Sequence, residues 1–73
     1  MDENDIQVLF NAINDGYKLA KKYAHIEDTE QYWAEVNKAF DDITLKTSSA
    51  AAQKIIASIY LFMVDIYERK VMK

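Results

Sequence analysis

The sequence lacks cysteine and proline, and it has one glycine and one histidine among its 73 residues. Without cysteine, disulfides and thiolate metal sites are excluded. The near absence of glycine and proline disfavours sheets and long loops, and the lone Gly16 excludes a glycine-rich phosphate loop. We therefore expect one small helical domain over residues 1–73, of a size that buries only about 60% of the surface of its unfolded chain.

The chain also lacks a recognisable targeting segment. The first residues, MDENDIQ, are acidic where a signal peptide is basic. The apolar run from Ile55 to Val64 lies between Lys54 and Asp65 and is only about half of the 20 residues that a membrane-spanning helix needs. The net charge of −3 disfavours nonspecific binding to phosphates. We expect a cytoplasmic protein that does not enter a membrane.

Apolar residues in the first segment are separated by steps of three and four, which predicts a helix over residues 4–24. The expected core stripe consists of Ile6, Leu9, Phe10, Ile13, Tyr17, Ala20 and Ala24. Asn14-Asp15-Gly16 resembles a turn, and glycine costs a helix roughly 1 kcal/mol relative to alanine. Because the stripe resumes in phase at Tyr17, we expect the helix to continue.

A second helix is predicted over residues 29–46. Asp28 and Gln31 have the spacing of a capping box at its start. Its core stripe is Tyr32, Trp33, Val36, Ala39, Phe40 and Ile43. The opposite side carries acids interrupted by Lys38 and Lys46, so we interpret it as a solvated face rather than as a mimic of nucleic acid.

A third helix is predicted over residues 49–71, after a short polar connection of Thr47, Ser48 and Ser49 that supplies its N-cap. Its core stripe is Ala52, Ile55, Ile56, Ile59, Phe62, Met63, Ile66 and Tyr67. Short connections make consecutive helices antiparallel neighbours. The sequence therefore predicts an all-α, up-down-up three-helix bundle.

Apolar residues outside these core stripes form second stripes on the first and third helices. They are Val8, Ala12, Leu19 and Tyr23, and Ala57, Tyr60, Leu61, Val64 and Val71. Their regular spacing predicts a protein interface, of which a symmetric homodimer is the commonest kind. The alternative is that the first or third helix is enclosed on two sides within the bundle.

Polar clusters give little indication of chemistry. His25 stands near Glu27, Asp28 and Glu30, but a single histidine in a loop beside capping acids predicts no metal site. No nucleophile is paired with a base, and a bundle of this size has little room for a substrate pocket. We expect neither catalysis nor a cofactor.

A small basic patch of Lys18, Lys21 and Lys22 next to Tyr23 is the alternative functional signal. Lysines contact phosphates and an aromatic ring can stack on a base. The same lysines are also explained by the negative end of the first helix. A nucleic-acid-associated protein is therefore the second hypothesis.

Three segments look like small helical proteins encoded in phages and prophages of Firmicutes. These segments are Lys21-Lys22-Tyr23-Ala24, Asp28-Thr29-Glu30-Gln31-Tyr32-Trp33 and Ile66-Tyr67-Glu68-Arg69-Lys70. The turn-like Asn14-Asp15-Gly16 departs from that pattern. The resemblance implies a phage accessory protein in the cytoplasm of a bacterial host, which binds or blocks a host protein such as a defence factor. It implies no site residues.

Overall fold

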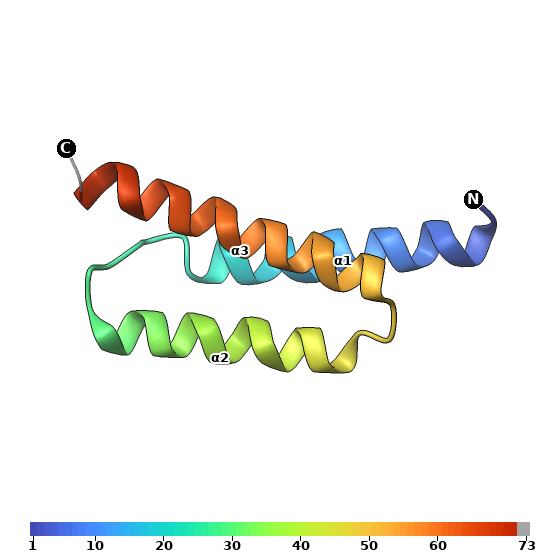
Figure 1. Cartoon of the computed structure of the whole chain (residues 1–73), viewed down its shortest axis with the longest axis horizontal. Coiled ribbons are helices and arrows are strands. Elements are labelled where there is room, and N and C mark those ends of the chain that lie inside the picture. Colours follow the sequence, from blue (N-terminus) through green and yellow to red (C-terminus); the bar gives the residue numbers. More distant parts are fainter. Residues whose placement is uncertain (72–73) are drawn as a thin grey trace.

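The computed structural model describes residues 1–71, which contain three helices and no strand. The helices are α1 (Glu3–Lys22), α2 (Glu30–Lys46) and α3 (Ala50–Val71). Figure 1 shows that they run up, down and up, so α1 and α3 are parallel and α2 is antiparallel to both. The predicted all-α three-helix bundle is confirmed, and every helix boundary lies within two residues of its predicted position.

Helix α1 begins with a capping box and continues through the turn-like triplet. The Asp2 carboxylate accepts from the Asp5 backbone N–H at 2.9 Å, and the Asp5 carboxylate accepts from the Asp2 N–H at 3.4 Å. Gly16 has no positive φ. The expectation that the helix continues past Gly16 is confirmed, because nothing in its backbone conformation requires a turn there.

The N-cap of helix α2 is Thr29, one residue later than the predicted cap, Asp28. The hydroxyl of Thr29, not the carboxylate of Asp28, accepts from the Tyr32 backbone N–H, at 3.1 Å. Asp28 instead accepts a hydrogen bond from the hydroxyl of Tyr67. The predicted capping box of Asp28 and Gln31 is therefore wrong, because a neighbouring threonine caps the helix and α3 engages the aspartate.

Side-chain hydrogen bonds fix both connections. The Tyr32 hydroxyl donates to the Tyr23 carbonyl at 2.6 Å, which ties the end of α1 to the start of α2. The Gln53 amide donates to the carbonyls of Thr44 at 3.1 Å and Thr47 at 2.8 Å. At the start of α3 the Ser49 hydroxyl accepts from the Ala52 N–H at 3.2 Å. These bonds satisfy backbone groups that the helix ends leave unpaired.

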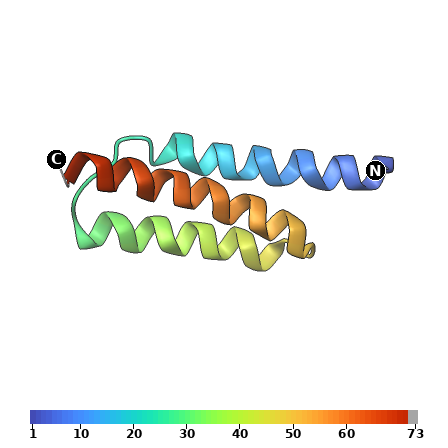
Figure 2. The same cartoon turned by 45° about the horizontal axis from the view of Figure 1, so that its top comes forward.

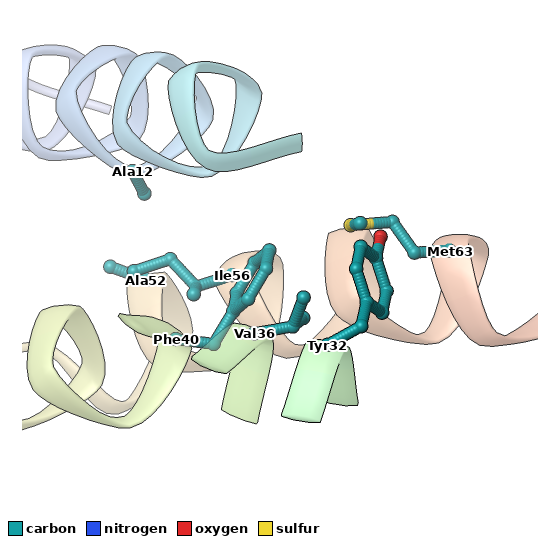
Figure 3. Packing of buried hydrophobic residues seen from close by; sticks show 7 residues of the cluster. All are labelled: Ala12, Tyr32, Val36, Phe40, Ala52, Ile56 and Met63. Carbon is teal, nitrogen blue, oxygen red and sulfur yellow. The ribbon is translucent and has the colours of Figure 1, made fainter. Parts of the chain in front are cut away.

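The core lies between the three helices (Figure 3). Its buried side chains are Ala12 from α1, Tyr32, Val36 and Phe40 from α2, and Ala52, Ile56 and Met63 from α3. Trp33 and Ile43 pack against this cluster, so the predicted core stripe of α2 is confirmed. The acids on the other side of α2 are exposed, as predicted.

Gly16 allows α1 and α3 to approach closely, and these two helices share the largest contact in the bundle. Gly16 is buried, and a Cβ placed on it would overlap the Cδ1 atom of Ile59. Ala12, one turn earlier, is also small and is only 3% exposed. Small residues four apart lie on one side of a helix and let a neighbouring helix pack against its backbone.

The sequence assigned the wrong side of α1 to the core. Of the predicted core stripe, Ala20 packs against the core, but Ile6, Phe10, Ile13 and Tyr17 are each about half exposed or more. The second stripe lies inside instead: Ala12 is buried, and Val8, Leu19 and Tyr23 pack against the core. Apolar residues cover more than half of the circumference of α1, so spacing alone could not choose a side. The two small residues, Ala12 and Gly16, decide which side meets α3.

The bundle is an elongated rod of 44 × 21 × 18 Å. Its parallel helices are staggered, as both views show (Figures 1 and 2). The first turns of α1 project beyond α2 and α3 at one end, and the last turns of α3 extend past the end of α1 at the other. The bundle therefore ends in α1 on one side and in α3 on the other.

Candidate protein interaction surface

Five of the nine predicted interface residues lie on the core. Ala12 is buried, and Val8, Leu19, Tyr23 and Tyr60 are packed against the core cluster. The bundle itself covers much of these side chains, so they offer a partner less surface than their spacing suggested. The alternative named from the sequence, an enclosed helix, describes this side of α1 correctly.

The other four predicted residues are on α3 and keep some exposure. Ala57, Leu61 and Val71 are exposed, and Val64 is half-buried. They lie on the side of α3 that faces away from α1, together with Lys54 and Glu68. This side is a mixture of apolar and charged residues, whereas the other side of α3 is more uniformly apolar.

Exposed apolar side chains of two helices meet along the seam between α1 and α3. We call it the α1–α3 face, and its members are Ile6, Phe10, Ile13 and Tyr17 from α1 with Ile55, Ile59 and Phe62 from α3. Phe10 is 60% exposed and Phe62 61%. A shallow groove of about 420 Å³ on this seam is lined by Ile13, Ile55, Ser58, Ile59 and Phe62. The groove shows that residues of both helices contribute to one surface.

Charges flank this face at its two ends and have opposite signs. The first turn of α1 carries Glu3 and Asp5 after the capping Asp2. The last turn of α1 carries Lys21 and Lys22, and the last turn of α3 carries Arg69 and Lys70. Because α1 and α3 are parallel, both basic turns lie toward the same end of the rod (Figure 2). The face is thus an apolar strip between an acidic end and a basic end.

A smaller aromatic groove lies between α2 and α3. It is lined by Trp33, Tyr60, Val64 and Tyr67, with a volume of about 170 Å³. The Trp33 ring packs edge-to-face on Tyr67 at 5.0 Å and on Tyr60 at 6.3 Å between ring centroids. The packed rings therefore form the walls of the groove. Within residues 1–71 the buried indole N–H of Trp33 has no hydrogen-bond partner.

Two tyrosines at this end of the bundle are held in their neutral form. The hydrogen bond to Asp28, together with partial burial and the charge of that carboxylate, raises the pKa of Tyr67. Burial raises the pKa of Tyr32, and the charge of Glu27 adds to the effect.

The basic patch is only partly available for ligands. Lys18, Lys21 and Lys22 are exposed. The Lys22 ammonium lies over the ring of Tyr23, 5.5 Å from its centroid, and the same ring packs edge-to-face on Tyr32. Tyr23 is therefore occupied by packing within the chain and does not offer a free platform for a nucleic-acid base.

His25 is exposed in the connection between α1 and α2. Over the described part of the chain, no three histidine or acidic side chains are grouped in a way that could hold a metal ion. Of the acids near His25 in sequence, Asp28 accepts a hydrogen bond from Tyr67.

Helix α3 meets the length and composition criteria of a membrane-spanning helix. It has 22 residues and is therefore longer than the apolar run from Ile55 to Val64, from which no membrane contact was expected. Core helices of soluble proteins meet the same criteria when they are mostly buried, but only 17% of the apolar stretch of α3 is buried, Ala52, Ile56 and Met63 among it. A lipid surface therefore belongs among the outcomes that experiments on this chain should distinguish.

The chain matches no known protein family, no curated protein and no solved structure. The α1–α3 face is thus the main functional lead, and it was missed because α1 was assigned in the wrong orientation. The signal that identifies it is present in the sequence. Ala12, Gly16 and Ala20 are the smallest residues of the apolar part of α1 and are four apart, and small residues mark the side where another helix approaches.

Proposed function

We propose that this chain is a non-catalytic protein-binding module that acts by occupying a partner surface with its α1–α3 face. Soluble monomers seldom expose large continuous apolar surfaces, and those that do generally use them for binding. The observation that carries the proposal is the exposure of Phe10 and Phe62, two large aromatic side chains on adjoining helices of the same face. Exposed aromatic residues are typical anchors of protein interfaces.

The arrangement of the face supports binding over a role in folding. Ile55 and Ile59 at the base of the face pack against the core, whereas Phe10 and Phe62 are not among the side chains that do so. The face has an apolar centre and charged ends, which is the usual composition of a protein interface. The resemblance to phage accessory proteins is the basis for proposing a host protein among its partners.

Capture experiments with a face variant test this proposal. Tagged wild-type chain should retain a specific protein, either from a bacterial lysate or as an added untagged copy. The double variant Phe10→Glu/Phe62→Glu should lose it while remaining helical, because both side chains are already in contact with water. If the double variant captures the same proteins as the wild type, the α1–α3 face is not the binding surface.

Leu61 provides a matched control on the same helix. It is 60% exposed, almost the same as its neighbour Phe62, but it points away from the α1–α3 face. Leu61→Glu adds the same charge to the same turn and should leave capture unchanged. Loss of capture in Leu61→Glu but not in Phe62→Glu would move the interface to the opposite side of α3.

A further inference from the structure

The proposed function leaves open what covers the α1–α3 face, and the following inference rests on that function. We propose that the occupant is a second copy of this chain. The two copies are related by a two-fold axis that runs across the helices, so that α1 packs antiparallel on the partner's α1. The two α3 helices then lie on the same side of this α1 pair and face one another, and each α2 stays on the outside of the dimer.

The surface area of the chain agrees with a partner of this size. A folded monomer of 8.5 kDa is expected to expose about 4,700 Å². The chain exposes 5565 Å², which is about 900 Å² more. A standard interface removes about 800 Å² from each partner. One copy seated on the α1–α3 face would therefore bring the surface to the value expected for a chain of this mass.

Charge selects the direction in which the second copy lies. A two-fold axis along the helices would place both acidic ends together and both basic ends together. An axis across the helices places the acidic first turn of each α1 opposite the basic last turn of the partner's α1. Opposite charges at the rim of an interface favour that orientation and disfavour the other.

The spacing along α1 makes the two sets of contacts compatible. Glu3 and Lys21 are 18 residues apart, which is five full helical turns, so they lie on the same side of α1, roughly 27 Å from each other. Their midpoint is at position 12. The apolar residues of α1 on this face extend from Ile6 to Tyr17, and their midpoint is almost the same. An axis near position 12 therefore centres the apolar contact and brings Glu3 close to the partner's Lys21.

The stagger of the bundle fits the same arrangement. The start of α1 projects beyond its own α3 (Figures 1 and 2). In the antiparallel dimer this projecting acidic turn lies beside the end of the partner, where α3 extends past α1. Arg69 and Lys70 belong to that end of α3. Arg69 is already paired with Asp65 of the same helix, at 3.1 Å, so Lys70 is the cation that this end of α3 can turn toward the partner's acidic overhang.

The mass in solution is the first test. Light scattering at about 100 µM should give twice 8.5 kDa for the wild type and for Leu61→Glu. Phe62→Glu and Phe10→Glu/Phe62→Glu should give monomers, with a dissociation constant raised at least tenfold and an unchanged helical spectrum. A wild type that remains a monomer, or forms a trimer, overturns the inference.

Crosslinking tests the orientation. The chain has no cysteine, so Glu3→Cys/Lys21→Cys introduces the only two thiols. A bis-maleimide too short to span the roughly 27 Å within one α1 should convert this variant into covalent dimers. Each single variant should give at least tenfold less product. Efficient crosslinking of Glu3→Cys with itself would indicate the parallel arrangement and overturn the proposed axis.

The outcomes separate this inference from the function on which it rests. A monomeric wild type whose capture of a host protein is lost in Phe10→Glu/Phe62→Glu retains the proposed function and rejects the second copy. A monomeric wild type that floats with phosphatidylglycerol vesicles, when the same variant does not, assigns the face to lipid and rejects both. A monomeric wild type with no difference in capture or flotation also rejects both.

Discussion

At the scale of single residues, Tyr32 links the core to the connection between α1 and α2. Its ring is buried in the core and packs edge-to-face on Tyr23 and Trp33. Its hydroxyl donates to the Tyr23 carbonyl at the end of α1. One side chain therefore contributes both to packing and to the geometry of the first connection.

Tyr32→Phe keeps the ring and removes the hydroxyl. The Tyr23 carbonyl then loses its donor, which should lower the free energy of unfolding by about 1 kcal/mol at neutral pH. Urea unfolding followed by circular dichroism measures this change. An unchanged midpoint would show that water replaces the tyrosine hydroxyl without loss.

The raised pKa of Tyr32 predicts a pH dependence of known sign. Burial, and then the charge of Glu27, favour the neutral phenol in the folded chain and raise the pKa of Tyr32. In the unfolded chain the pKa of a tyrosine is about 10. This contribution to stability is complete below pH 10 and is lost as the pH rises through the higher pKa of the folded state. Tyr32→Phe should therefore flatten the decrease in stability between pH 9 and pH 12. An equally steep decrease in the variant would assign the effect to other groups.

Gly16 shows how much one small residue contributes to a helix contact. Gly16→Ala gains roughly 1 kcal/mol of helix propensity but requires the end of the Ile59 side chain to rotate, which costs a similar amount. We expect little net change in stability. Gly16→Leu places a large side chain against α3 and should cost about 2 to 3 kcal/mol. Denaturant titration of both variants tests this, and equal stability of the two would contradict a close contact at Gly16.

At the scale of helices, the sequence predicted best where apolar residues occupy one side only. The side of α2 that faces the core was assigned correctly, because acids and lysines cover its other side. In α1, apolar residues cover both the core side and the α1–α3 face, so helical spacing fits either orientation. In α3, Phe62 was assigned to the core for the same reason and is exposed.

The boundaries of the helices were also easier to predict than their caps. Capping depends on which of several neighbouring polar side chains reaches a particular N–H, and Asp28 and Thr29 differ by one position. A distant residue decided between them, since Tyr67 engages Asp28. Gln53, which holds the α2–α3 connection, carried no signal in the sequence because its two acceptors are backbone carbonyls.

Exchange of charges on α1 tests the proposed antiparallel packing at the level of this helix. Lys21→Glu places an acid opposite the partner's Glu3 and should weaken the dimer roughly threefold to tenfold, because two rim pairs change from attraction to repulsion. The double variant Glu3→Lys/Lys21→Glu restores opposite charges at both ends and should recover most of the affinity. Sedimentation equilibrium measures both constants. A double variant weaker than Lys21→Glu would contradict the pairing.

At the scale of the whole molecule, the chain has a small core and a large exposed surface. Seven hydrophobic side chains are buried among residues 1–71, and a domain of this length is marginally stable on its own. The α1–α3 face therefore affects stability as well as recognition. Only the folded chain can bury this face against a partner, so binding stabilises the folded state over the unfolded one. Folding and association are linked when most folded chains are in the dimer.

This linkage between folding and association gives a prediction for the wild-type chain, with the variants as controls. If dimers unfold to separate chains, the melting temperature rises with protein concentration, by roughly 10 °C for a hundredfold increase in a dimer of this size. Phe10→Glu/Phe62→Glu should melt at one temperature across that range, because its monomer unfolds alone. Leu61→Glu should follow the wild type. Calorimetry from 5 to 500 µM distinguishes the cases, and a melting temperature of the wild type that is independent of concentration would mean that the face contributes nothing to folding stability through self-association.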